Sequence, residues 1–393
     1  MKKFFSVLSV IFLLLGLVSI GVPGLSETEE GVRLVCLNIG KADCMLLLYQ
    51  DEAYLIDAGY AHTYPALQTA LAQLGVARLN GVFLTHCHED HAGGLFPLAQ
   101  SDVPVGAWYA ARIYFGPTAL QHPAVLAAAQ RNESVAWLDA GNVIPVGTDG
   151  YFTVLGPLTL NEDNENNNSL VMRFSSPQGS ILLAGDMKED EEYGLLAAGL
   201  LSPCDLLKAG HHGDNKATSK ALLNAVMPKA AVILTSTLEE PDTPASSTLK
   251  NLSGIGCQVY VSQDYHDALL FTLKGGQVTF QDVQWQGVPE RPSGVGLAID
   301  VDRDTLTIIN RGSAELSLSG CCVYSTKGNE LISLPDVLVV PGGAYTIGSD
   351  ASDAPVDMTA QSKRIWSKKK LDIAILYDAY GRPVACTNNG LAE

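Results

Sequence analysis

Three histidines and one aspartate within six positions constrain this 393-residue chain more than any other feature. His86, His88, Asp90 and His91 belong to the segment Thr85–Gly94, which follows a short apolar run that predicts a strand. Imidazole and carboxylate groups are preferred donors for metals such as zinc and manganese. The segment therefore predicts a metal site at a strand end. The alternative interpretation is a polar surface cluster that binds no metal.

Three other predicted strands also end in residues that suit a metal site. Asp57 follows Leu55-Ile56, and Asp186 ends the segment Leu182–Asp186. Each aspartate alone is a more ordinary turn residue, but with the histidine cluster both become candidate site residues. His211 and His212 follow a predicted strand that begins at Asp205. This histidine pair could ligate a metal, bind an anionic group of a substrate or donate a proton to a leaving group.

Short apolar strands alternate with amphipathic helices from Gly31 onward, which is typical of an α/β fold. The predicted strands are Arg33–Ile39, Met45–Tyr49, Ala53–Asp57, Val82–Thr85, Tyr151–Leu155, Leu170–Phe174, Ile181–Ala184, Val232–Thr235 and Gln258–Val261. The predicted helices are Tyr64–Leu74, Ala124–Gln130, Glu189–Ala198 and Ser219–Val226. This order favours two sheets sandwiched by helices in a first domain, residues 31–283.

The sequence pattern changes after residues 284–296, a proline- and glycine-containing segment that predicts a linker. Beyond it the apolar runs are short and alternating, and several are separated by glycine or proline turns. This spacing favours a small all-β, immunoglobulin-like sandwich as a second domain, residues 297–387.

The N-terminal residues 1–26 have the pattern of an export segment. Lys2 and Lys3 precede the apolar run Phe4–Val22, which contains no charge. This pattern predicts either a cleaved signal peptide or an uncleaved membrane anchor. We therefore expect an extracytoplasmic protein, secreted or anchored, that meets the membrane only through this segment. No protein partner can be inferred from the sequence.

Six segments occur in the order of motifs seen in the metallo-β-lactamase superfamily. The segments are Asn38–Asp43, Leu55–Gly59, Thr85–Gly94, Asn166–Val171, Leu182–Asp186 and Leu207–Gly213. They look most like the soluble hydrolase domain of the competence DNA-uptake channel proteins (ComEC type). The resemblance covers roughly residues 31–283, and it implies an αββα sandwich with two divalent metal ions, zinc or manganese, at the sheet ends.

The resemblance also implies a role for each matching residue. His86 and His88 would hold one metal, Asp90 and His91 the other, and Asp186 would bridge both. Asp57 would orient these ligands from behind, and Asp90 is a candidate catalytic residue as well. His211 or His212 would bind the phosphate or protonate the leaving oxygen. The candidate substrate contacts are Asn167, Asn168 and Ser169.

One departure from the superfamily pattern affects the second metal. Thr243-Pro244-Ala245 stands where relatives commonly have His-Pro-Ser, and that histidine is expected to complete the second metal shell. Its loss could weaken one metal, promote His211 or His212 to ligand, or leave a degenerate enzyme.

The C-terminal region resembles a lamin-tail domain, on the segments Leu306–Gly312, Leu316–Gly320 and Val340–Tyr345. Such a domain implies an accessory binding module. A basic segment inside it combines cations with a tryptophan and is a candidate polyanion patch that would act through charge and stacking. Its residues are Lys363, Arg364, Trp366, Lys368, Lys369 and Lys370. The alternative interpretation is a solvated loop.

The leading hypothesis is an exported phosphodiesterase or nuclease in which a hydroxide held by two metals attacks phosphorus. A hydrolase of a small cell-envelope ester, such as a phosphocholine ester or a lactone, is the second. A degenerate metal-binding or adhesive module on a cell-envelope polymer is the third. The net charge of -17 argues against a nucleic-acid substrate, because an acidic surface repels phosphates. Most of this charge lies in residues 27–296, which carry 14 basic and 30 acidic residues. Nucleic acid would therefore have to rely on the metals or on the basic segment.

Overall fold

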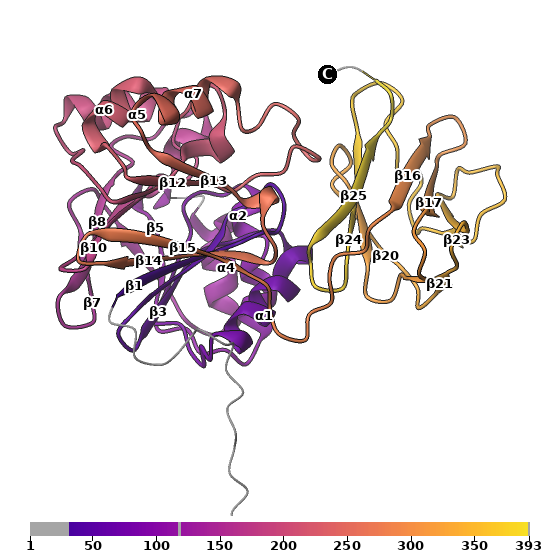
Figure 1. The fold of residues 1–393 in the computed structure, drawn as a ribbon, viewed down its shortest axis with the longest axis horizontal. Coiled ribbons are helices and arrows are strands. Elements are labelled where there is room, and N and C mark those ends of the chain that lie inside the picture. The colour runs from indigo at the N-terminus through magenta and orange to yellow at the C-terminus, as the bar shows by residue number, and fades with distance from the viewer. Residues whose placement is uncertain (1–30, 117–118, 392–393) are drawn as a thin grey trace, which may run out of the picture.

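The computed structural model describes residues 31–116 and 119–391, and the predicted export segment lies outside these residues. Two sheets face each other in the first domain, and helices cover the outer face of each (Figure 1). The predicted αββα sandwich is therefore confirmed. Among the described residues, no helix is long and apolar enough to cross a membrane.

The first sheet has eight strands in the order β15-β14-β1-β2-β3-β4-β5-β6. Their bounds are β1 Val32–Leu37, β2 Cys44–Tyr49, β3 Glu52–Ala58, β4 Gly81–Phe83, β5 Trp108–Ala111, β6 Val135–Leu138, β14 Ala268–Lys274 and β15 Gln277–Val283. The strands from β3 to β6 are parallel to one another. Helices α1 (Tyr64–Gln73), α3 (Leu95–Gln100) and α4 (Pro123–Gln130) pack on this sheet. In α1, Leu67 and Leu71 are buried because they share one helical face.

The second sheet has seven strands in the order β13-β12-β11-β10-β9-β8-β7. Their bounds are β7 Val143–Val146, β8 Gly150–Gly156, β9 Val171–Ser176, β10 Gly179–Leu183, β11 Leu206–Lys208, β12 Ala230–Ile233 and β13 Gln258–Val261. Its covering helices are α5 (Glu189–Ala197), α6 (Lys220–Val226) and α7 (Ser246–Gly254). Between the sheets, the rings of Phe83, Phe152 and Phe174 pack edge to face or tilted in one apolar core.

The C-terminal strands form a separate β-sandwich around their own apolar core. Its four-stranded sheets have the orders β16-β17-β22-β23 and β20-β19-β24-β25, and β18 pairs with β21. The bounds are β16 Val295–Asp300, β17 Thr305–Asn310, β18 Leu316–Ser317, β19 Cys322–Ser325, β20 Glu330–Ser333, β21 Leu338–Val339, β22 Ala344–Gly348, β23 Met358–Thr359, β24 Ile373–Tyr377 and β25 Pro383–Asn388. The sandwich architecture agrees with the sequence, whereas the lamin-tail assignment stays a prediction.

The position of Trp366 differs from the exposed one that the sequence led us to expect. Its side chain is 0% exposed and belongs to the core of the β-sandwich. The neighbouring backbone is fixed as well, because Asp304 accepts hydrogen bonds from the amides of Ile365 and Trp366. The predicted stacking of Trp366 on a polyanion is therefore wrong, since a buried ring offers no face to a ligand.

The two domains are joined by buried polar contacts. Arg382 of the β-sandwich lies 2.6 Å from Asp267 of the first domain and 2.7 Å from Asp378 of its own. It also donates a hydrogen bond to the carbonyl of Pro289, in the segment that connects the domains. Because Trp285 in that segment is buried against the first domain, the connection is packed rather than free.

Candidate metal centre

The strand ends predicted to carry chemistry meet at one edge of the sandwich. His86, Asp186 and His211 each lie three residues after the last residue of a strand, namely β4, β10 and β11. β10 and β11 are parallel neighbours, so their following loops leave the sheet on the same side. Asp90 and His91 lie on the short helix α2 (Glu89–Ala92), which continues from the His86 loop.

Asp186 is shared by two sets of possible metal ligands. The ligand atoms of His86, His88 and Asp186 all lie within 4.8 Å of one another, and a second set unites Asp90, His91, Asp186 and His212. Oδ2 of Asp186 is 3.2 Å from Nε2 of His91 and 3.4 Å from Nε2 of His212. The structure thus brings together the five predicted ligands and adds His212 to them.

The donor set fits a divalent metal because several of its buried atoms lack hydrogen bonds. Within the described residues, Nε2 of His91, Nε2 of His212 and Oδ1 of Asp186 are buried and have no hydrogen-bond partner. Leaving a polar atom buried and unpaired costs about 1–3 kcal/mol. A cation held between these converging imidazole and carboxylate atoms would satisfy them.

Asp57 and the backbone hold the two buried imidazoles in orientation. Asp57 accepts hydrogen bonds from Nδ1 of His91 and from the hydroxyl and amide of Thr85, each at 2.8 Å. Nδ1 of His212 donates to the carbonyl of Leu234 at 2.8 Å. Both rings therefore present Nε2 to the cluster, which is how second-sphere partners orient metal-bound histidines.

The backbone of the cluster is strained. Asp57, His211 and His212 have φ values of 56°, 41° and 51°, in the left-handed region that residues with a Cβ rarely adopt. Such conformations persist where the surrounding structure enforces them, and they concentrate at functional sites.

Charge pairing keeps the cluster ionised despite its burial. Burial lowers the pKa of His91, but Asp186, Asp57 and Asp90 more than offset it and hold that pKa well above its usual range. Burial raises the pKa of Asp186, yet His212 and His91 bring it well below its usual range. The bridging carboxyl is therefore in the ionised form that a metal requires, and His91 would release its proton on binding a metal.

Two lysines complete the site, and the sequence analysis assigned a role to neither. Lys208 is fully buried, and its ammonium lies 2.5 Å from Oδ2 of Asp43 and 3.6 Å from Oδ1 of Asp186. Lys41 lies 3.6 Å from Asp90 and 3.0 Å from Glu240. The sequence did hold a clue to the role of Lys208, because a charged lysine at the end of the otherwise apolar strand β11 is unusual.

The asparagine-rich loop supports the cluster from its side. Asn166 contacts Nε2 of His211 at 3.1 Å. Asn167 accepts a hydrogen bond from the amide of Lys188, and Ser169 accepts one from the amide of Asp186. Asn167, Asn168 and Ser169 are all buried. These side chains hold protein groups in place, and their role as substrate contacts stays a prediction.

Thr243, which stands in place of the expected histidine, bonds to neighbouring protein groups. Its hydroxyl is buried, 2.6 Å from that of Thr235, and it donates to the carbonyl of Glu240. Of the three consequences anticipated for the missing histidine, the geometry matches the recruitment of His212 to the second ligand set.

The residues of the predicted basic patch do not form one surface, because some pair with aspartates and others line a cavity. Lys368 pairs with Asp302 at 3.4 Å, and Arg364 lies 3.7 Å from Asp304. Lys369 and Lys370 line a cavity between the domains that also contains Lys41. Lys363 is exposed and does not line this cavity.

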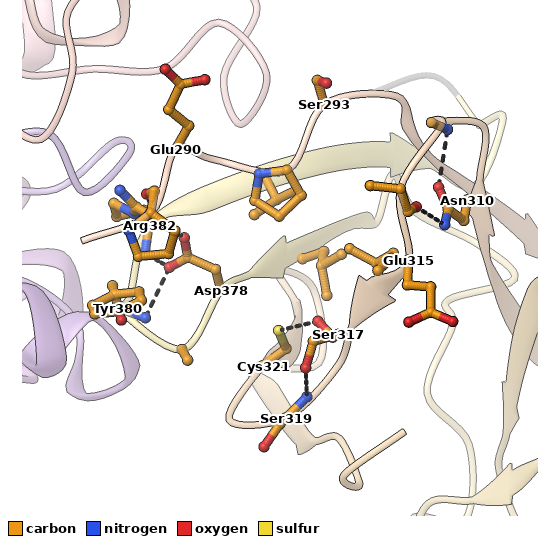
Figure 2. A pocket seen from close by; sticks show the side chains of 18 of the residues that line it. Glu290, Ser293, Asn310, Glu315, Ser317, Ser319, Cys321, Asp378, Tyr380 and Arg382 are labelled. Carbon is orange, nitrogen blue, oxygen red and sulfur yellow. Dashed lines mark hydrogen bonds and ion pairs between the residues drawn. The ribbon is translucent and has the colours of Figure 1, made fainter. Parts of the chain in front are cut away.

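A different cavity, about 450 Å³, lies between the connecting segment and the β-sandwich (Figure 2). Glu290 and Ser293 lie on one side of it, and Glu315 and Ser317 on the other. None of the metal-ligand candidates lines this cavity.

An αββα sandwich with histidine and aspartate ligands at its sheet ends defines a class of metal-dependent hydrolase folds. The family model described as the metallo-beta-lactamase superfamily matches residues 37–237, which is more than half of the chain. The chain therefore belongs to the metallo-beta-lactamase superfamily.

Curated relatives include two competence proteins. The chain is 24% identical over 219 residues to ComE operon protein 3 of Bacillus subtilis, covering 50% of this chain and 27% of that protein. It is 28% identical over 292 residues to competence protein ComA of Neisseria gonorrhoeae, covering 71% of this chain and 38% of that protein. The chain thus spans less than half the length of either relative.

Solved structures with a similar fold are more distant. CmlA, a diiron β-hydroxylase from Streptomyces venezuelae, has a TM-score of 0.44 and 14% identity, covering 63% of this chain and 54% of that one. YhfI from Bacillus subtilis has a TM-score of 0.40 and 14% identity, covering 64% of this chain and all of that one.

Proposed function

We propose that this protein is an exported, metal-dependent phosphodiesterase that cleaves nucleic-acid strands. The observation that carries the proposal is the sharing of Asp186 between two ligand sets, with unpaired donor atoms from His91 and His212 facing it. A pair of divalent ions bound there would supply a water of lowered pKa and neutralise the charge developing on a phosphoryl group. Zinc and manganese both suit these donors.

The chain's own residues around the cluster suit an anionic substrate. Lys41 lies beside Asp90 with its ammonium partly exposed, where it can bind a phosphate oxygen. His211 lies 3.9 Å from Asp186 at the outer side of the cluster. Burial lowers the pKa of His211 to about 4, so the ring is neutral at pH 7. A neutral imidazole held by Asn166 can donate a hydrogen bond to a phosphate or leaving oxygen and so bind it, without transferring a proton.

The proposed nucleic-acid substrate and the proposed export of the protein are supported by different observations. Two competence proteins among the relatives favour nucleic acid over a small ester. The export assignment rests on Lys2, Lys3 and the apolar run Phe4–Val22, which lie outside the described residues. Assignment of the second domain as a lamin-tail module is part of the same proposal and would make it the accessory that holds a polymer.

A substrate panel with matched variants tests the proposal. The purified chain, supplied with zinc or manganese, is assayed on single-stranded DNA, duplex DNA, bis(4-nitrophenyl) phosphate, a phosphocholine ester and a lactone. We expect phosphodiester hydrolysis that is lost when His86 and His88 are both changed to Ala. His266→Ala is the control, because the His266 side chain is exposed, pairs with Asp282 and is not among the metal-ligand candidates of the described residues.

Three outcomes would contradict the proposal. Phosphodiester hydrolysis that survives the double change would show that the cluster is not the active site. Hydrolysis of the small ester or lactone without any phosphodiester cleavage would favour the cell-envelope hydrolase instead. Absence of turnover on every substrate would favour a degenerate binding module.

A further inference from the structure

A cavity of about 620 Å³ lies where the two domains meet beside the metal centre. Lys41 and Tyr60 line it from the first domain, and Lys327, Lys369 and Lys370 line it from the β-sandwich. Lys41 connects this cavity to the metal centre, because its ammonium is 3.6 Å from Asp90. A ligand in the cavity would therefore lie next to the reacting phosphate.

The β-sandwich wall of the cavity carries uncompensated positive charge. Within residues 31–116 and 119–391, Lys327, Lys369 and Lys370 form no ion pair through their ammonium groups. Lys368, in the same segment, is instead paired with Asp302. All three cavity lysines are exposed. Their charges thus border a shared space and are available to an anion.

The two acidic residues of the cavity are occupied at the opposite wall. Glu240 pairs with the ammonium of Lys41 at 3.0 Å, and Glu239 accepts a hydrogen bond from the backbone amide of Lys41 at 3.1 Å. Glu239 is 8% exposed, and burial raises its pKa to about 7. These carboxylates fix Lys41 and leave the three lysines of the β-sandwich without a partner.

We infer that this cavity is an anion subsite that binds the phosphate backbone of a single nucleic-acid strand and delivers it to the metal centre. The inference rests on the proposed function. The volume lies in the range of about 300–1,000 Å³ that takes small ligands, so the cavity admits a short stretch of one strand and not a duplex. The subsite also answers the charge objection, because it is basic in a chain with a net charge of -17.

A pair of matched double variants tests the subsite. K369A/K370A removes two cavity lysines, and K363A/K368A removes two lysines of the same segment that do not line the cavity. A fluorescently labelled single-stranded oligonucleotide is titrated with each full chain, and the dissociation constant is measured by anisotropy across salt concentrations. Each phosphate contact on a single strand contributes about 0.7 to the salt slope. We expect K369A/K370A to flatten the slope by about 1.4 and to weaken binding at least fivefold at 0.1 M salt.

Kinetics add a readout that a general loss of structure would not reproduce. For K369A/K370A we expect KM on the oligonucleotide to rise at least fivefold while kcat stays within twofold. Its activity on bis(4-nitrophenyl) phosphate, which is too short to reach the cavity, should equal that of the unmodified chain. The wild-type chain should bind the single strand more tightly than the duplex.

The outcomes separate the subsite from the proposed function. Equal dissociation constants and salt slopes for the two double variants would overturn the subsite, even if the protein cleaves phosphodiesters. Loss of binding in K369A/K370A alone, in a protein that cleaves no phosphodiester, would support the subsite and refute the proposed function.

Discussion

Replacement of Lys208 by Met tests whether a buried cation holds the metal ligands in place. Lys208 is fully buried, pairs with Asp43 at 2.5 Å and donates a hydrogen bond to the carbonyl of Gly185. Burial lowers the pKa of Lys208, but Asp43 and Asp186 more than offset this and raise it, so the lysine is charged. Removing one partner of a buried ion pair costs about 3–5 kcal/mol, because the other charge is left unpaired.

We therefore expect K208M to lower the free energy of unfolding by about 3–5 kcal/mol, out of a total of about 5–15 kcal/mol for a typical domain. The measurement is urea unfolding at pH 7 with chelator present, so that bound metal does not differ between variants. The matched control is K229M, since Lys229 pairs with Asp205 at 2.7 Å but is exposed. An exposed pair of this kind contributes about 0–1 kcal/mol.

The double variant K208M/D43N sharpens the test. Changing Asp43 to Asn removes the charge that K208M leaves unpaired, so the double variant should lose less than the sum of the two single changes. A coupling free energy of at least about 1 kcal/mol is expected for residues in direct contact. A K208M loss no larger than that of K229M would refute the view that this buried cation organises the site.

Three further predictions concern the domain core, the domain junction and pH. W366A should lower the free energy of unfolding by about 3–5 kcal/mol, measured in urea, because Trp366 fills the core of the β-sandwich. The folded variant should bind an oligonucleotide as tightly as the wild type does. Weaker binding by the folded variant would show that Trp366 stacks on the ligand after all. R382M leaves Asp267 and Asp378 buried without their cation, so it should lower the free energy of unfolding by about 3–5 kcal/mol. Calorimetry measures the change, and an unchanged Tm would contradict the prediction. Burial raises the pKa of Glu239 from 4.5 to about 7, so the folded state binds the extra proton and stability falls as pH rises through that window. Because Gln does not titrate, the urea midpoint of E239Q should fall less than that of the wild type between pH 4.5 and about 7. An unchanged dependence of the midpoint on pH would argue against the raised pKa of Glu239.

Much of the fold was predictable because its signals are local. The strands β1 to β4 and β8 to β13 follow runs of apolar residues, and the helix α1 follows a 3.6-residue period. The ligands His86, His91 and Asp186 were predictable for a related reason, because each comes just after such a run. The strands β14 and β15 were not predicted, although Ala268–Lys274 is almost entirely apolar.

The rest of the site depends on contacts between distant parts of the chain. The pairing of Lys208 with Asp43 joins the end of β11 in one sheet to the residue just before β2 in the other, and neither local sequence shows it. The burial of Trp366 is decided by packing in the β-sandwich, whereas its neighbouring lysines made the segment look exposed. The cavity between the domains depends on how they dock, which Arg382 and Asp267 fix across 115 positions of sequence.

The most direct test of the account is the metal content of the protein and its dependence on Asp186. The purified chain is saturated with zinc or manganese, dialysed, and analysed for bound metal beside D186N and the control D102N, whose aspartate is exposed and outside the cluster. We expect two metal ions per chain in the wild type and in D102N, and one or fewer in D186N. Two metal ions retained by D186N, or none bound by the wild type, would contradict the claim that Asp186 joins two metal sites.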